Sequence, residues 1–142
     1  DVIVDAMAVL LIRKPESFDV IVATNMFGDI LSDEAAELSG GLGLGGSINA
    51  SGERAIAQAA HGSAPDIAGK GIANPAALMT STAMLMGWLA RNNGSNALTD
   101  AFELLIKSVD GALADPANQT PDLGGSSSTQ AFGNAVLEHI EK

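Results

Sequence analysis

The 142-residue chain contains no cysteine, and it has only seven basic residues against seventeen acidic ones. Without cysteine, disulfide bonds and thiolate-ligated zinc sites are excluded. The net charge is −10, and the three arginines and four lysines are scattered, which argues against binding to nucleic acid because such binding needs clustered basic side chains. An anionic ligand would therefore be held by backbone N–H groups, by a metal ion or by residues that this chain lacks.

Long apolar runs are also missing. The longest, Ala6–Ile12, is far too short to span a membrane, and no basic segment followed by an apolar stretch marks a targeting sequence. We therefore expect a cytoplasmic protein with no membrane partner. The length suffices for one ordinary domain with a real core. Because the chain starts at Asp1 directly in a β-type run, we expect a fragment of a longer protein.

The residues that are present predict an α/β protein. A strand at 1–4, a helix at 5–14, a strand at 18–23 and a helix at 28–39 alternate in the order that favours a parallel sheet. The glycine- and serine-rich stretch at 40–53 is the expected domain boundary. The remaining expected elements are a short strand at 54–60 and helices at 75–91, 98–114 and 129–140.

Three carboxylates occupy the strand–helix junctions of this expected sheet. Asp29 and Asp33 lie four residues apart, so a helix presents both on one face, and Asp5 follows the first predicted strand. Open α/β sheets bind ligands at such junctions, and carboxylate oxygens suit Mg²⁺ or Mn²⁺. Spacing alone favours the simpler interpretation, in which Asp29 complements the helix dipole and Asp33 is solvated.

The segment 61–75, HGSAPDIAGKGIANP, is the second candidate site. Its glycines let the backbone approach a ligand closely. Asp66 could accept hydrogen bonds from a ribose diol, Asn74 could read an adenine edge as donor and acceptor together, and His61 could stack on a base. The loop does not match GxGxxG, and no such motif joins a strand to a helix, so the common dinucleotide-binding fold is not indicated. Spacing alone supports nucleotide binding and a purely structural loop about equally.

The two motifs together point to a family. NMFGDILSDEAAEL followed by HGSAPDIAGKGIANP closely resembles the isocitrate/isopropylmalate dehydrogenases, which are metal-dependent β-decarboxylating dehydrogenases. The stretches VDAM, FDVIVATN, GGLGLG and PDLGGSSSTQAF also fit, in the right order and at about the right distances. The chain looks like the C-terminal part, somewhat under half, of a family subunit. The resemblance implies the isopropylmalate/isocitrate dehydrogenase-like α/β fold, with 1–39 in the substrate and dimerisation domain and 40–142 in the nucleotide-side domain.

The resemblance also implies the cofactors. Asp5, Asp29 and Asp33 match the aspartates that bind Mg²⁺ or Mn²⁺, with the position of Asp5 contributed to the partner subunit's site. Asp66 would bind the adenosine ribose diol, and Asp66 followed by Ile67 looks like the version that prefers NAD to NADP. The positions that match the NAD-binding loop are His61, Gly62, Ser63, Ala64, Asp66, Ile67 and Asn74.

Two features depart from the family's pattern. Gln58 stands three residues before the loop histidine, where the family often has an acidic residue, and this leaves the substrate open. The family's catalytic tyrosine and lysine and its substrate-clamping arginines would lie upstream of Asp1, and three scattered arginines cannot clamp a dicarboxylate. No catalytic residue is therefore assigned in this chain.

We expect part of an NAD-dependent, Mg²⁺- or Mn²⁺-dependent oxidoreductase that oxidatively decarboxylates a 2-hydroxy acid of the 3-isopropylmalate or isocitrate type, with the fragment alone inactive. The alternatives are a non-catalytic nucleotide-binding, regulatory or self-associating module and, with less support, a plain metal-binding domain. The first two predicted helices carry more apolar surface than they can bury alone, which predicts a homodimer or larger oligomer. The side chains expected to be buried against another chain are Met7, Leu10, Leu11, Ile30, Leu31 and Leu38.

Overall fold

The computed structural model describes residues 1–141, which form two compact units, the first Asp1–Leu42 and the second from Gly43 onward. Each unit has its own cluster of buried apolar side chains. The point of division lies inside the glycine-rich stretch at 40–53, and the roles of the two units as substrate and nucleotide domains stay predictions. Within residues 1–141, no helix has both the length and the apolar character needed to cross a membrane.

The first unit is a pair of helices. Helix α1 (Val4–Arg13) packs on α2 (Asn25–Leu38), and a short 3-10 turn, η1 (Pro15–Ser17), follows α1. Both helices confirm the sequence prediction, although α2 begins three residues earlier than the predicted start at residue 28. Met7 and Leu11 lie one turn apart on α1 and are buried against Leu31 of α2.

The strands predicted at 1–4 and 18–23 are absent. Residues 1–3 and 18–24 make no strand pairing, so the predicted parallel sheet is wrong for the described part of the chain. The run FDVIVA has the composition of a doubly buried strand, but such a strand needs neighbours that bond its backbone, and residues 1–141 do not provide them. Phe18 packs against the α1–α2 cluster, but the valines are left uncovered, with Val20 81% and Val22 92% exposed.

The six apolar side chains expected at an interface differ in burial, and Leu10 among them is half-buried. Met7, Leu11 and Leu31 are each only 5–6% exposed and close the α1–α2 contact within their own chain, so the prediction that they are buried against another chain is wrong. The apolar face that their helical spacing creates is covered by the neighbouring helix of the same chain. Ile30 and Leu38 remain 56% and 51% exposed. Elsewhere in the first unit, residues 1–4 and 20–24, together with Met7, Phe18, Phe27 and Leu31, line an open apolar hollow of about 810 Å³.

The second unit begins with a hairpin of two antiparallel strands, β1 (Gly46–Ala50) and β2 (Ala55–Ala59). Strand β2 confirms the short strand predicted at 54–60, whereas β1 lies in the glycine-rich stretch that the sequence predicts as a boundary loop. The buried hydroxyl of Ser81 ties the hairpin to the helix that follows. It accepts the N–H of Ser47 at 3.1 Å and donates toward the carbonyl of Gln58 at 2.7 Å.

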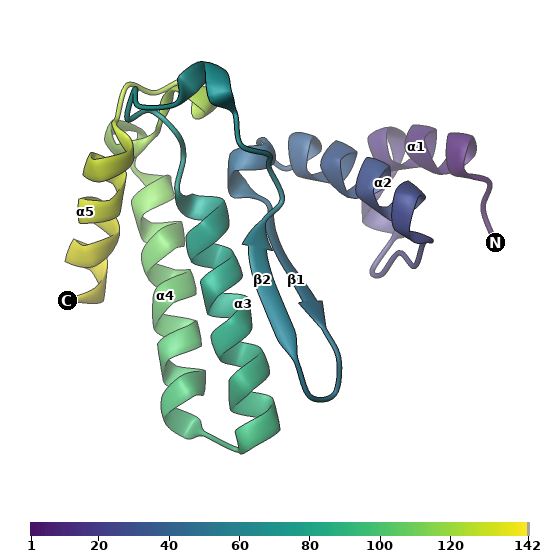
Figure 1. Cartoon of the computed structure of the whole chain (residues 1–142). Helices are drawn as coiled ribbons and strands as arrows, with labels where there is room; N and C mark the ends of the chain where they lie inside the picture. The colour runs from purple at the N-terminus through teal and green to yellow at the C-terminus, as the bar shows by residue number, and fades with distance from the viewer. Residues whose placement is uncertain (142) are drawn as a thin grey trace. The chain divides into compact units, whose positions relative to one another are not determined.

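Three long helices complete the second unit. Helix α3 (Ala76–Asn93) packs on the hairpin, α4 (Asn96–Ala114) packs on α3, and α5 (Thr129–Ile140) packs on α4 (Figure 1). Their bounds agree with the predicted ranges to within two residues. Gly94 ends α3 with a φ of 63°, and the hydroxyls of Ser95 and Ser128 cap α4 and α5. The other 3-10 turns are η2 (Leu42–Leu44), η3 (Pro65–Ile67), η4 (Pro116–Asn118) and η5 (Pro121–Leu123).

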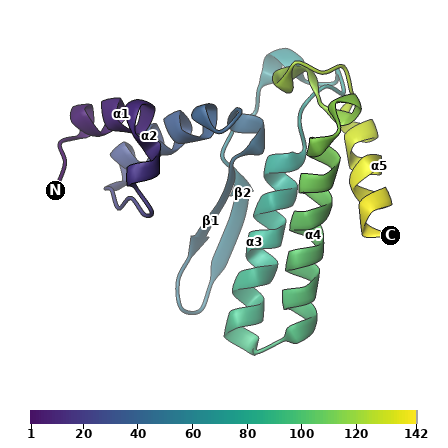
Figure 2. The same cartoon turned by 180° about the vertical axis from the view of Figure 1, so that it is seen from behind.

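Small side chains around one aromatic ring form the core of this unit. Phe132 is fully buried in a cluster with Val109 and Val136. The helices approach closely, since a Cβ on Gly111 would lie 2.8 Å from the ring of His139. The tip of the hairpin lies at one end of the α3–α4 pair, and the connections β2–α3 and α4–α5 lie together at the other end (Figures 1 and 2). Buried alanines fill much of the remaining core: Ala76, Ala77, Ala83, Ala90, Ala112 and Ala135.

Candidate nucleotide-binding site

The connection between β2 and α3 is an exposed loop. Every residue from 61 to 66 is solvent-exposed. At Gly62, Gly69 and Gly71 no atom lies within 4 Å of the place where a Cβ would stand, and the last two have φ values of +75° and +64° that favour glycine. The loop therefore presents open backbone at three points, as the sequence predicts for a segment that a ligand approaches closely.

Ala64 gives the loop its sharp turn. Its φ of 41° and ψ of 62° lie in the left-handed region, which costs a residue with a Cβ about 1–2 kcal/mol. Its carbonyl accepts the N–H of Ile67 at 3.1 Å and so closes η3. The Nδ1 of His61 lies 2.8 Å from the carbonyl of Gly62, which holds the ring beside the turn. Asp66 projects from η3 into solvent, where its carboxylate is free to accept hydrogen bonds.

Asn74, at the end of the loop, is buried, with 7% exposure. Its Oδ1 accepts the N–H of Ala76 at 3.0 Å, at the start of α3. Its Nδ2 donates to Oδ2 of Asp122, also at 3.0 Å. Both polar atoms of the Asn74 side chain thus already have protein partners, and an adenine bound by this amide would have to share them. The role predicted for Asn74 in nucleotide binding stays a prediction, and its role in ending the loop is visible.

A second segment, made of the α4–α5 connection and the first residue of α5, supports the loop. The N–H of Thr129 donates to the carbonyl of Gly71 at 2.9 Å, and its hydroxyl donates to the carbonyl of Ala73 at 2.5 Å. The fully buried Thr120 donates its hydroxyl to Oδ1 of Asp122 at 2.5 Å, so that carboxylate is bonded on both oxygens. These contacts pin the last residues of the loop and leave its first half open.

Thr120 and Asp122 are residues that sequence analysis does not single out. The stretch around them predicts only a loop, and the hydrogen bond between Asn74 and Asp122 joins positions 48 residues apart, which no local period reveals. The available signal is a threonine and an aspartate two residues apart around Pro121, a pattern typical of local side-chain turns.

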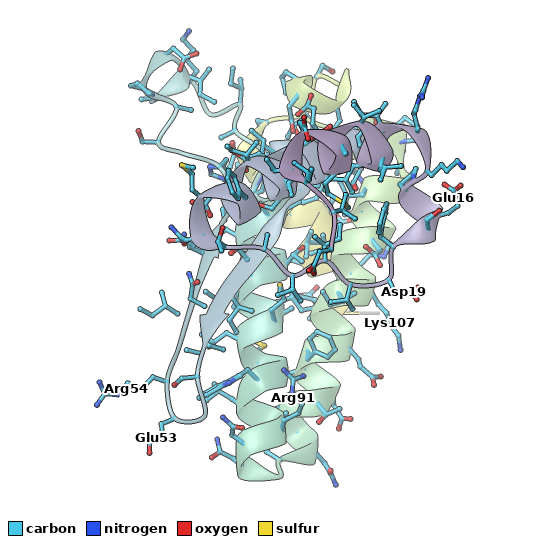
Figure 3. All side chains as sticks on the ribbon, turned by 90° about the vertical axis from the view of Figure 1, so that its right-hand side faces the viewer. Glu16, Asp19, Glu53, Arg54, Arg91 and Lys107 are labelled. Carbon is cyan, nitrogen blue, oxygen red and sulfur yellow. The ribbon has the colours of Figure 1, made fainter. Side chains whose placement is uncertain are left out.

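The charges near the loop are few. Arg54 lies at the tip of the hairpin and Arg91 on α3, both toward the end of the α3–α4 pair remote from the loop (Figure 3). The charged residues of the loop itself are Asp66 and Lys70, both exposed. An anionic ligand would therefore depend mainly on backbone N–H groups here.

The three aspartates predicted to bind a metal do not converge within one chain. Asp29 and Asp33 are exposed and lie one turn apart on α2, whereas Asp5 lies in the first turn of α1 and accepts the N–H of Ala6 at 2.7 Å. Among residues 1–141, no three or more His, Cys, Asp or Glu side chains are grouped so that they could hold a metal ion. Because the resemblance assigns Asp5 to the site of a partner subunit, the triad stays a prediction.

The sequence and the fold both match known proteins. Residues 1–136 match the isocitrate/isopropylmalate dehydrogenase family. The chain is 48% identical to the homoisocitrate dehydrogenase of Methanocaldococcus jannaschii, over all of this chain and 39% of that protein. It is 47% identical to the isocitrate/homoisocitrate dehydrogenase of Thermus thermophilus, over 99% of this chain and 40% of that protein.

A solved structure, that of isocitrate dehydrogenase from Methylococcus capsulatus, matches with a TM-score of 0.90 at 41% identity, over all of this chain and 40% of that chain. This match confirms the predicted isopropylmalate/isocitrate dehydrogenase-like α/β fold. The chain thus spans about two fifths of the length of these relatives. From the sequence match over residues 1–136 together with the fold, the chain belongs to the isocitrate/isopropylmalate dehydrogenase family.

Proposed function

We propose that this chain forms the NAD-binding and metal-binding part of an oxidoreductase that oxidatively decarboxylates a 2-hydroxy acid of the 3-isopropylmalate or isocitrate type. The observation that carries the proposal is the loop at 61–75, which is open in its first half and pinned at its end by Asn74. Similar proteins bear the names homoisocitrate dehydrogenase and 3-isopropylmalate dehydrogenase, and the proposed substrate class follows those names.

Asp66 is the residue that selects the nucleotide in this proposal. Its exposed carboxylate accepts hydrogen bonds from the two hydroxyls of an adenosine ribose and repels a 2′-phosphate. Lys70 is the basic side chain within the loop, and one exposed lysine is too little to hold that extra phosphate. NAD is therefore preferred to NADP. The bound cofactor supplies the acceptor for the hydride that leaves C2 of the substrate.

The remaining loop residues shape the nucleotide's surroundings. The open backbone at Gly62, Ser63 and Ala64 offers N–H groups to the cofactor, and the ring of His61 is held where it can cover a base or the nicotinamide end. Ile67, half-buried in η3, fixes the turn that presents Asp66.

The aspartates form the second half of the proposal. Asp29 and Asp33 of one subunit, together with Asp5 of a second, provide carboxylate oxygens that suit Mg²⁺ or Mn²⁺. Held by these carboxylates, an ion would supply the Lewis-acid chemistry that oxidative decarboxylation of a 2-hydroxy acid requires. The part played by this chain is to hold two carboxylates one turn apart on α2, fixed by the contact of Leu31 with α1.

A site shared in this way requires association, and we propose a homodimer or larger oligomer. The exposed side chains of Ile30 and Leu38 on α2 supply apolar surface for a second chain. Sedimentation at micromolar concentration tests this, with Ile30→Glu expected to weaken association and Leu137→Glu, at an equally exposed apolar side chain on α5 of the second unit, as the matched control. A wild-type chain that remains monomeric contradicts both the interface and the shared metal site.

Binding of nucleotides to the 142-residue chain tests the NAD assignment. We expect NAD to shift the NMR signals of the loop amides, and NADP to bind about tenfold more weakly or worse because its phosphate faces Asp66. Asp66→Ala should lower the affinity for NAD, while Asp110→Ala, on an exposed part of α4, should leave it unchanged. Equal binding of both nucleotides would contradict the NAD preference, and binding of neither would contradict nucleotide binding altogether.

A second candidate function is a non-catalytic nucleotide-binding or self-associating module. It is favoured by the exposed loop at 61–66 and by the exposed apolar side chains of Ile30 and Leu38, which could bind a nucleotide or a second chain without a catalytic group. Assays with isocitrate, homoisocitrate and 3-isopropylmalate, each with NAD and Mg²⁺, separate the two functions. Turnover supports the enzyme, and NAD binding without turnover by the protein as purified supports the module.

A further inference from the structure

We infer that Asp122 is a positioning residue for the nucleotide loop: it acts on the cofactor through Asn74 and does not touch the cofactor itself. This inference rests on the proposed function, because it assigns to Asp122 an effect on NAD binding at 61–75. It adds a residue outside the loop, from a connection that neither the sequence motifs nor the predicted site includes.

The first step of the argument is the bonding of the Asp122 carboxylate. Oδ2 accepts Nδ2 of Asn74 at 3.0 Å, and Oδ1 accepts the hydroxyl of Thr120 at 2.5 Å. Both partners are buried, Asn74 to 7% exposure and Thr120 fully, although Asp122 as a residue is exposed at the rim. An acidic side chain at the surface thus reaches inward to satisfy two buried polar groups, which is costly to disrupt because each would lose its partner.

The second step concerns the space around this carboxylate. A Cβ on Gly43 would lie 2.5 Å from Oδ2 of Asp122 and 3.0 Å from Cβ of Asn74. A third segment of chain therefore lies close against the pair, and a Cβ at residue 43 would force the Asp122 carboxylate to move. The side chain of Asn74 is held by shape on one side and by hydrogen bonds at both of its polar atoms. Its orientation is fixed before any ligand arrives.

The third step connects Asn74 to the open part of the loop. Asn74 is the last loop residue before Pro75, and its Oδ1 bonds the first turn of α3. Thr129, the first residue of α5, holds Gly71 and Ala73 just after the connection that carries Asp122. From Gly71 to Asn74 the loop is therefore anchored, whereas the residues from His61 to Asp66 are exposed. Loss of the Asp122 contact removes one of these anchors and frees the amide of Asn74 to turn, so the position of Asp66 relative to α3 is then held less tightly.

The chemistry of residue 122 predicts which replacements are tolerated. Asparagine can still accept from Asn74 with its Oδ1, and its amide can donate to Thr120, whose hydroxyl rotates to accept. Alanine can do neither. Thr120→Val keeps the shape and the Asn74 contact but removes one donor to Asp122. The Oδ1 of Asp122 that loses this donor can bind water instead, because Asp122 is exposed. Thr120→Val should therefore disturb the loop less than Asp122→Ala does.

The test measures NAD affinity and amide hydrogen exchange on the 142-residue chain and its variants. Asp122→Ala should raise the dissociation constant for NAD about tenfold, while Asp122→Asn and Thr120→Val should stay within about threefold of wild type. In the absence of nucleotide, Asp122→Ala should speed exchange at the loop amides of Ile67 and Lys70 and leave the amides of Val109 and Ala112 in α4 unchanged.

The matched control separates positioning from general stability. Trp88→Ala removes a side chain of the same unit whose Nε1 donates to the carbonyl of Ser51 at the tip of the hairpin, at the end of the α3–α4 pair opposite the loop, so it should lower the melting temperature without changing the affinity for NAD. If Asp122→Ala speeds exchange in α4 as much as in the loop, or if Trp88→Ala weakens NAD binding equally, the positioning role is wrong. Unchanged loop exchange and unchanged affinity in Asp122→Ala also overturn it. Faster loop exchange in a protein whose wild type binds no NAD overturns the proposed function and retains the anchoring.

Discussion

Gly125, in the connection that carries Thr120 and Asp122, provides a sharp test of how tightly this region is built. A Cβ at this position would lie 1.9 Å from the carbonyl oxygen of Gln119 and 2.5 Å from its carbonyl carbon. Ordinary contact begins at 3.4 Å, so Gly125→Ala forces the two segments apart by about 1.5 Å. The clash is between the backbone at residue 125 and the backbone of Gln119, and neither can move aside as a flexible side chain can.

The hydrogen bonds that would be disturbed set the magnitude. Gly125 donates its N–H to the carbonyl of Thr120 at 3.1 Å, and Ser127 donates to the carbonyl of Gln119 at 2.9 Å. A displacement of this size breaks both bonds, and each contributes about 0.5–1.5 kcal/mol net. Gly125→Ala should therefore cost about 1–3 kcal/mol, plus residual strain. For a unit of this size, a loss of about 2 kcal/mol corresponds to roughly 10 °C in melting temperature.

Gly133→Ala is the matched control. Gly133 lies inside α5, and its added Cβ would meet only the Cε of Met79, at an ordinary 3.9 Å. Because alanine is favoured over glycine in a helix interior by about 1 kcal/mol, this change should stabilise the protein. Thermal unfolding followed by far-UV circular dichroism, supported by urea titration, measures both variants. The reasoning fails if Gly125→Ala melts at or above the wild-type temperature, or if both changes move it in the same direction.

Three further predictions concern stability. Phe132→Ala should lower the free energy of unfolding by about 3–5 kcal/mol, since this ring is fully buried, while Leu137→Ala on the same helix, 55% exposed, should cost far less; equal losses would contradict the observed core. Ser81→Ala should cost about 1–3 kcal/mol in urea titrations and speed amide exchange in the hairpin, because a strand amide and a strand carbonyl lose their partner; hairpin exchange unchanged from wild type would refute this. At Ala64, glycine should be tolerated as well as alanine or better and valine should be worse, because the left-handed backbone penalises branched side chains; a valine variant that melts with wild type would refute the strained turn.

The helices of this chain could be predicted from the sequence because their signals are local. The range predicted for α5 agrees with the structure, and α4 begins only two residues before its predicted start, at the point where Ser95 caps it. Apolar side chains at helical spacing and a capping hydroxyl are both read within a few neighbouring residues.

The strands could not be predicted in the same way, because a strand is defined by its partner. FDVIVA has strong strand composition and remains unpaired, whereas GSINA, with a glycine, a serine and an asparagine, forms β1 because β2 and Ser81 bond it. Local composition favoured the first and not the second.

The candidate site shows the same division between local and distant information. The loop motif at 61–75 is contiguous and could be identified from the residues themselves, including the exposed Asp66. The contact between Asn74 and Asp122 spans 48 positions, and the proximity of Gly43 to both adds a third segment, so the anchoring of the loop follows only from the folded chain.

The close packing of alanines in the second unit limits which single substitutions this fold can tolerate. Ala77, Ala83 and Ala112 are fully buried, so a larger side chain at any of them would force neighbouring side chains or helices to shift. A larger side chain at one of these positions therefore requires a smaller side chain at a neighbouring position. If the two substitutions arise one after the other, the protein that carries only the first is destabilised. In a mutational scan, this region should accept exchanges among alanine, serine and glycine and reject the leucine and isoleucine that most cores accommodate. Substitutions accepted at these buried positions are thereby confined to small residues, while the exposed faces of the same helices are free to vary.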